Sequence, residues 1–98
     1  MIIPTKFKVA GFEVNVESQD KLEDNNYGYW NDVTNTITLA KNISLKNGEL
    51  TPLTDRQIAN TFYHELFHSF QFYSGKKYCE VECNMFANFM LEFEETKQ

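Results

Sequence analysis

Two histidines separated by three residues are the first feature of the sequence that could carry chemistry. His64 and His68 enclose the segment His-Glu-Leu-Phe-His, and the chain has no other histidine. In an α-helix, positions four apart differ by about 40° around the axis, so both imidazoles project from one face and can bind one Zn²⁺ ion. This His-Glu-x-x-His spacing is typical of zinc-dependent hydrolases and predicts a zinc site on a helix.

Glu65 follows the first histidine and lies about 100° further around the same helix. A carboxylate at that position borders the ion without joining its ligands, which is where a general base for the metal-bound water must lie. The spacing therefore predicts hydrolysis with Glu65 as the base. The alternative is that two histidines lie on a helix surface by chance and that Glu65 is an ordinary solvated carboxylate.

The third metal ligand must be Asp, Glu or Cys, because a catalytic zinc usually has three protein ligands and both histidines are used. Further along the chain, Glu82 shares a helical face with three aromatic residues, which are Phe86, Phe89 and Phe93. On that expected buried face an unpaired carboxylate would be costly, and a cation is its best partner. We therefore predict Glu82 as the third ligand. Glu80, expected to point outward, and Cys79 are lesser candidates, and the alternative role for Glu82 is an ion pair with a lysine or a cap.

The elements that must position these residues are strands in the first half of the chain. Apolar and polar residues alternate over 6–17 and 27–41, which predicts two hairpins of a small antiparallel sheet. The first hairpin bends at Gly11, and a turn divides the second near residues 31–35. The residues expected on the inner face of the second hairpin are Val33, Ile37 and Leu39.

Two helices are expected in the second half of the chain. Thr54 followed three residues later by Gln57 predicts a capping box, and Gly75 is a natural residue to end this first helix. The second helix is predicted from about Tyr78 to Glu95. Strands followed by helices predict an α+β fold, and the length suits a single domain over residues 1–98.

The composition argues against several classes of function. Nine Lys and Arg against 14 Asp and Glu give a net charge of -5, so no nucleic-acid partner is expected. No segment approaches the roughly 20 apolar residues of a membrane span, and the N-terminus lacks a secretory pattern, so we expect a cytoplasmic protein. In that reducing compartment Cys79 and Cys83 are expected to remain thiols and to act as small buried apolar residues rather than metal ligands.

Two blocks of the sequence resemble the ImmA/IrrE family of zinc metallopeptidases. Residues 61–68 read Thr-Phe-Tyr-His-Glu-Leu-Phe-His, where the family shows Thr-x-x-His-Glu-Leu-x-His. Residues 80–87 read Glu-Val-Glu-Cys-Asn-Met-Phe-Ala, where the family shows Glu-x-Glu-Ala-Asn-x-Phe-Ala. Phe67 stands where the family usually has Gly, and Cys83 replaces the Ala.

The resemblance implies a zinc-dependent endopeptidase with a minimal zincin-like core, made of the sheet, the motif helix and one further helix. In the family, the residue matching Glu82 is the third zinc ligand. Family members often cut a repressor, so the resemblance also implies a protein or peptide substrate, with a regulatory protein as one candidate. The alternative function is a non-catalytic metal-binding module that binds a protein without cutting it.

The mechanism also needs a place for the substrate and a donor for the transition state. A substrate peptide is expected to lie extended along an edge strand, at Thr34 to Ala40. No third histidine exists, so a tyrosine is the expected hydrogen-bond donor. The candidates near the motif are Tyr63, Tyr73 and Tyr78.

Overall fold

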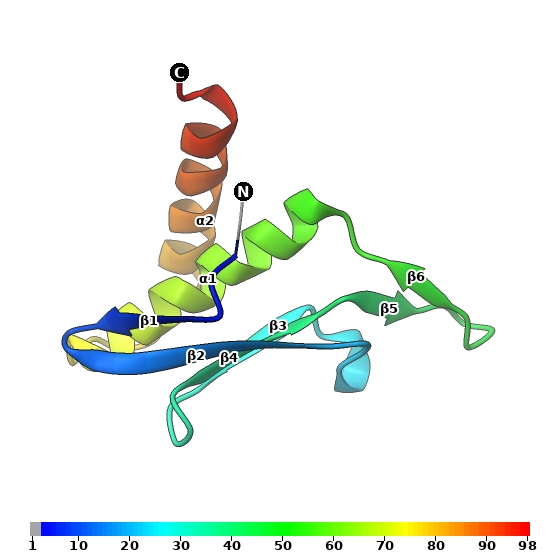
Figure 1. Cartoon of the computed structure of the whole chain (residues 1–98), viewed down its shortest axis with the longest axis horizontal. Coiled ribbons are helices and arrows are strands. Elements are labelled where there is room, and N and C mark those ends of the chain that lie inside the picture. The colour runs from blue at the N-terminus through cyan, green and yellow to red at the C-terminus, as the bar shows by residue number, and fades with distance from the viewer. Residues whose placement is uncertain (1–2) are drawn as a thin grey trace.

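A computed structural model describes residues 3–98 as a four-stranded sheet, a two-stranded sheet and two helices (Figure 1). The strands are β1 (Lys6–Val9), β2 (Phe12–Gln19), β3 (Gly28–Asn31), β4 (Thr36–Ala40), β5 (Asn42–Ser44) and β6 (Leu50–Pro52). The helices are α1 (Asp55–Tyr73) and α2 (Glu80–Thr96), and a short 3-10 turn covers Glu23–Asn25. The predicted α+β fold, a small sheet followed by two helices, is confirmed.

The larger sheet is mixed, with the strand order β1-β2-β4-β3. The hairpins β1–β2 and β3–β4 are antiparallel, as predicted, but β2 and β4 run parallel, with Asn15 opposite Thr36. The prediction of an antiparallel sheet is therefore wrong for the central pair. Alternation fixes which face of a strand is buried, but it does not fix which neighbour the strand takes.

This strand order also changes which strand lies at the edge. β4 is hydrogen-bonded on both sides, so the predicted edge position of Thr34 to Ala40 is wrong. β3 forms the outer edge next to β4. The pair β5–β6 was not expected from the sequence, and it extends the chain between the sheet and α1 as a separate ribbon (Figure 1).

The core lies on both sides of α1, which runs between the sheet and α2 (Figure 1). Ile37 and Leu39 of β4 are buried, as predicted. Val33 was expected beside them but is 86% exposed, because Asn31 Oδ1 accepts hydrogen bonds from the backbone N–H of residues 33 and 34 and closes a turn there. The buried members of the core are Val14, Ile37, Leu39, Ala59, Phe62, Tyr63, Ala87 and Leu91.

The ends of α1 follow the sequence signals. Thr54 Oγ1 accepts a hydrogen bond from the Gln57 backbone N–H at 3.1 Å, and Gln57 Oε1 accepts from the Thr54 N–H at 2.8 Å, which confirms the capping box. At the other end Gly75 adopts a φ of +74°, a conformation that favours glycine. The Lys76 N–H then donates to the Gln71 carbonyl at 2.8 Å and closes the last turn.

The buried face of α2 is not the predicted one. Its buried residues are Cys83, Ala87 and Leu91, whereas Phe89 and Phe93 are exposed. The predicted stripe is therefore wrong for Glu82, Phe89 and Phe93, which are exposed, whereas Phe86 is half-buried and packs against the core. Small side chains let two helices approach closely, so the residues of least volume mark the contact between α2 and α1.

The described residues also bear on the state of the two cysteines and on the expected lack of a membrane span. Both cysteines are free thiols, with Cys83 buried and Cys79 half-buried. Within residues 3–98, neither helix has the length and apolar character needed to cross a bilayer.

The burial of β4 generates a prediction about stability. Replacing Ile37 with Ala removes methylene groups from a fully buried site, so we expect the free energy of unfolding to fall by about 2–5 kcal/mol. Val33→Ala is the matched control, because its side chain is exposed, and it should change stability by less than about 0.5 kcal/mol. Urea denaturation of both variants measures the difference, and equal effects would contradict this position of β4.

Candidate metal centre

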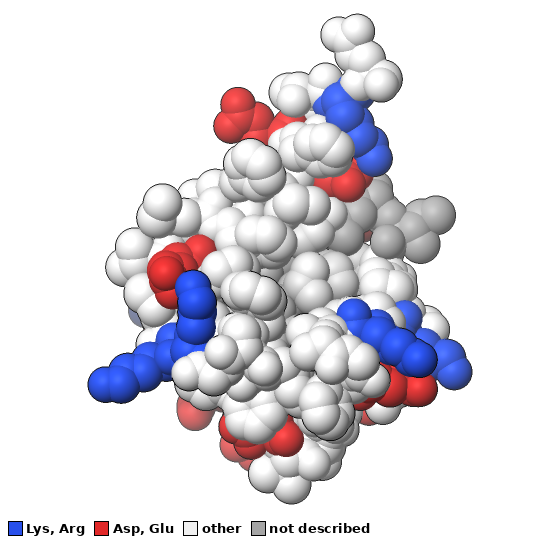
Figure 2. All heavy atoms as spheres, turned by 90° about the vertical axis from the view of Figure 1, so that its left-hand side faces the viewer, with Lys and Arg blue, Asp and Glu red and all other residues white. Residues whose placement is uncertain are grey.

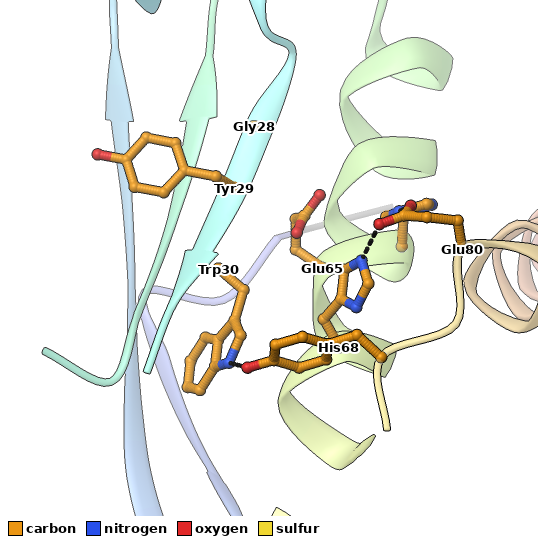
Figure 3. Close-up of a pocket in the computed structure, with 8 residues that line it drawn as sticks. Gly28, Tyr29, Trp30, Glu65, His68 and Glu80 are labelled. Carbon is orange, nitrogen blue, oxygen red and sulfur yellow. Dashed lines mark hydrogen bonds and ion pairs between the residues drawn. The ribbon is translucent and has the colours of Figure 1, made fainter. Parts of the chain in front are cut away.

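The two histidines of the motif lie on α1 where it faces β3 and the start of α2 (Figure 3). Their ring centroids are 5.0 Å apart, and both side chains are mostly buried. His64 Nε2 lies 2.7 Å from one carboxylate oxygen of Glu80, and His68 Nε2 lies 2.9 Å from the other. Both imidazoles therefore direct the same ring nitrogen toward one carboxylate.

The acidic residue at the imidazoles is Glu80 and not Glu82, which was predicted as the third ligand. Glu80 was expected to point outward, but it is the first residue of α2, and that end of the helix meets the histidine face of α1. Glu82 instead accepts a hydrogen bond from Gln71 Nε2 at 3.1 Å. Angular position around α2 was a poor guide, because it does not show which end of the helix approaches the motif.

A signal for Glu80 is present in the sequence. Small residues mark the face of α2 that packs on α1, and Glu80 lies one turn before Cys83 on that face. The Glu80 side chain is 69% exposed. Partial desolvation by its neighbours raises its pKa, but the charges of His68 and His64 and their hydrogen bonds together outweigh that effect, so the pKa is lowered. Glu80 is therefore held as a carboxylate beside the two rings.

Gln71 fixes the orientation of His68 from the buried side. Gln71 Nε2 donates to Glu82 and to the Cys79 carbonyl at 3.4 Å, and these oxygens can only accept. Its Oε1 must then face His68 Nδ1, which lies 3.1 Å away. A neutral His68 accordingly carries its proton on Nδ1, and its Nε2 presents a lone pair toward Glu80.

This donor set fits a cation. A neutral His68 and the Glu80 carboxylate would present lone pairs to each other, so a proton or a cation is needed between them, whereas His64 can meet the other carboxylate oxygen with a proton on Nε2 or with a lone pair. Ligand atoms of a tetrahedral zinc lie about 3.3 Å from one another, given bond lengths near 2.0–2.1 Å. The contacts of 2.7 and 2.9 Å are within about 0.6 Å of that spacing.

Cys83 offers a second set of donors. Its sulfur lies 3.4 Å from His68 Nδ1, and ligand atoms of His64, His68 and Cys83 all lie within 4.8 Å of one another, so this group could hold a metal ion. Burial, and after it the charges of Glu80 and Glu65, raise the pKa of the Cys83 thiol to about 12. A thiol must lose its proton to bind a metal, so this environment makes metal binding through Cys83 less favourable.

Glu65 is buried beside the histidines, as the motif predicts, and it faces β3 (Figure 3). Burial is the main cause that raises its pKa to about 8, and the charge of Glu80 adds to it, while a hydrogen bond from the Trp30 backbone opposes both. A cation at the imidazoles would lower this pKa. A carboxyl group poised near neutral pH is suited to proton transfer.

A cavity of about 370 Å³ opens over these residues, with β3 as its other wall. At Gly28 an added Cβ would lie 2.6 Å from Thr61 Cγ2 and 2.8 Å from the Thr38 carbonyl oxygen, so glycine is what allows β3 to approach α1 here. The residues that line the cavity are Gly28, Tyr29, Trp30, His64, Glu65, His68, Tyr78 and Glu80. Sequence reasoning missed the wall formed by β3, because alternation does not show which strand lies against α1.

Of the three candidate tyrosines, Tyr78 lines the cavity. Its hydroxyl accepts a hydrogen bond from Trp30 Nε1 at 3.1 Å and donates to Asp32 at 3.2 Å. Tyr63 is buried in the core, and Tyr73 donates to Asn35. Two tyrosines therefore line the cavity, Tyr78 and Tyr29, and of these only Tyr78 was among the candidates named from the sequence.

Among the predicted site residues, the structure brings together His64, Glu65 and His68 and places Glu82 behind Gln71. Comparison with known proteins finds no family model, no curated protein and no solved structure that matches the chain.

The contacts of Gln71 predict that it controls metal affinity through His68. Gln71→Leu removes the acceptor for Nδ1, so we expect the affinity for Zn²⁺ to fall by about 10–100-fold. The double variant Gln71→Glu with Glu82→Gln exchanges the amide and the carboxylate and keeps an acceptor toward His68, so it should retain most of the affinity. Competition with a chromogenic chelator measures both, and equal losses would contradict the orienting role.

Proposed function

We propose that the protein is a zinc-dependent metallopeptidase that hydrolyses peptide bonds of a protein substrate. The observation that carries this proposal is the convergence of His64 Nε2, His68 Nε2 and the Glu80 carboxylate beside the buried Glu65. The resemblance of residues 61–68 and 80–87 to the ImmA/IrrE family supports the same function and a zincin-like core.

The number and the type of the ligand side chains favour a catalytic zinc site over a structural one. Two imidazoles and one carboxylate leave a fourth position for water or substrate, whereas structural zinc sites are closed by four protein ligands. When bound, zinc polarises the scissile carbonyl and lowers the pKa of a water molecule. The cavity in front of the donors leaves room for both.

The chain's own residues supply the proton transfers and the hydrogen bonds. Glu65 takes a proton from the attacking water and passes it to the leaving amine, and its burial beside the imidazoles suits this task. The Tyr78 hydroxyl lines the cavity and would donate to the negative charge that develops on the carbonyl oxygen by turning its proton away from Asp32, its acceptor in the structure. The hydrogen bond that Trp30 Nε1 donates to that hydroxyl keeps it at the cavity.

β3 is the strand along which a peptide substrate would lie. It forms the outer edge of the sheet and one wall of the cavity. An extended peptide can add to such an edge through backbone hydrogen bonds, which suits an unfolded or flexible segment of a protein. In this proposal the scissile bond lies in the cavity between β3 and Glu65.

Replacing the proposed base separates hydrolysis from metal binding. We expect Glu65→Gln to retain zinc and to lower cleavage of an unstructured protein by about 10²–10⁴-fold, because the amide cannot accept the proton. Glu49→Gln, at an exposed site between β5 and β6, is the matched control and should cleave like the wild type. Mass spectrometry of the digest and metal analysis give the two readouts. If zinc is retained and the wild type cleaves no better than Glu65→Gln, the protein is the non-catalytic metal-binding module instead.

Metal affinity of three further variants identifies the third ligand. We expect Glu80→Gln to weaken zinc binding by at least about 100-fold, because it removes the charge at both imidazoles. Cys83→Ser and Glu82→Gln should each have a smaller effect, since the Cys83 thiol is held in its protonated form and Glu82 is bound to Gln71 instead of the imidazoles. Zinc competition titrations measure all three. A large loss in Cys83→Ser together with a small loss in Glu80→Gln would instead assign the set of His64, His68 and Cys83.

A further inference from the structure

An apolar stripe runs along the exposed side of α2. Its four members recur every fourth residue and are about half to two-thirds exposed: Val81 (66%), Met85 (66%), Phe89 (67%) and Phe93 (49%). We call this set the outer stripe. The buried face of α2 lies on the other side of the helix, so α2 is apolar on two sides, and a helix of that kind is expected to be covered on both.

An apolar groove adjoins the outer stripe. It has a volume of about 360 Å³ and is lined by Lys8, Val9, Leu66, Phe67, Phe70 and Phe86. Phe67 packs on Phe86 and on Phe70 with ring centroids 4.9 and 5.4 Å apart, so β1, α1 and the N-terminal half of α2 all contribute. Figure 2 shows a broad uncharged surface on the face that it views, with both basic and acidic side chains at its margins. Surfaces of this kind mark interaction sites.

The charges beside the groove and the stripe are complementary. Lys8 is the one charged residue that lines the groove. Glu92 lies between Phe89 and Phe93 along α2 and is exposed. Among the ion pairs of the described residues, none involves Lys8 or Glu92. One chain therefore carries both a groove with a positive rim and an apolar ridge with a negative charge.

We propose that the occupant of this surface is a second copy of the chain. The two α2 helices lie antiparallel, so that Phe89 and Phe93 of each copy enter the groove of the other, and Glu92 of each pairs with Lys8 of the other. The groove lies beside the N-terminal half of α2 and the two phenylalanines lie in its C-terminal half, so only an antiparallel, two-fold arrangement brings them together, and it does so twice.

The arrangement is compatible with the metal centre. The groove and the cavity share no lining residue, because Leu66, Phe67 and Phe70 lie on a different side of α1 from His64 and His68. Antiparallel helices also place the negative C-terminal end of each dipole beside the positive N-terminal end of the other. The pair therefore leaves the cavity open on each copy.

Sedimentation equilibrium of the full chain tests the pair. We expect the wild type to shift from monomer to dimer with a dissociation constant of about 1–100 μM, as for a small interface. Phe89→Glu should remain monomeric throughout this range. Val33→Glu makes the same apolar-to-acidic change at an exposed residue on the β3–β4 turn, and it should dimerise like the wild type. A monomeric wild type, or equal loss in the two variants, overturns the proposal.

A charge exchange tests the contact itself. Lys8→Glu and Glu92→Lys should each weaken dimerisation by about tenfold, because each places like charges together twice. An equimolar mixture of the two single variants restores both opposite-charge pairs and should recover wild-type association. Circular dichroism checks that each variant keeps its helices. Recovery of association in the mixture supports the antiparallel pair. No recovery overturns it, and this is also the result expected if a different protein covers the groove.

Discussion

The polar side chains that α1 carries into the interior are the constraint on which this structure depends. α1 is covered by the sheet on one side and by α2 on the other, so its buried polar groups need partners within the protein. Thr61 and Ser69 donate to carbonyl oxygens of their own helix, and His68 and Gln71 bind each other and α2. Among the residues that the structure describes, the Glu65 carboxyl group accepts a hydrogen bond only from the Trp30 backbone N–H, and its raised pKa reflects the cost of burying a carboxylate there. The least compensated group in the interior is thus the one at the cavity, where a reactive carboxylate is useful.

Local chemistry made much of the fold predictable. The capping box at Thr54, the glycine that ends α1 and the two hairpins each depend on residues within a few positions of one another, and all are found in the structure. The grouping of His64, Glu65 and His68 was predictable for the same reason, because one helix fixes their relative positions.

What the sequence did not show depends on contacts between distant elements. Hydrophobicity favours phenylalanine on the buried side of α2, but the contact with α1 selects Cys83 and Ala87, which let the helices approach closely. That error moved the expected ligand from Glu80 to Glu82. The parallel pairing of β2 with β4 has a similar origin, since alternation along a strand gives no information about its neighbours. Both errors concern which elements pack or pair with each other, and not whether a segment is a helix or a strand.

The donors of the site come from two helices, with the imidazoles on α1 and the carboxylate of Glu80 at the start of α2. Docking of α2 and occupancy of the site are therefore thermodynamically linked, because an ion that binds only the docked arrangement also stabilises it. The short connection from Ser74 to Cys79 is tied to Gln71, whose Nε2 donates to the Cys79 carbonyl and whose Oε1 accepts from the Cys79 N–H. An ion bound by donors on both helices would therefore add its binding free energy to the packing of α2 on α1.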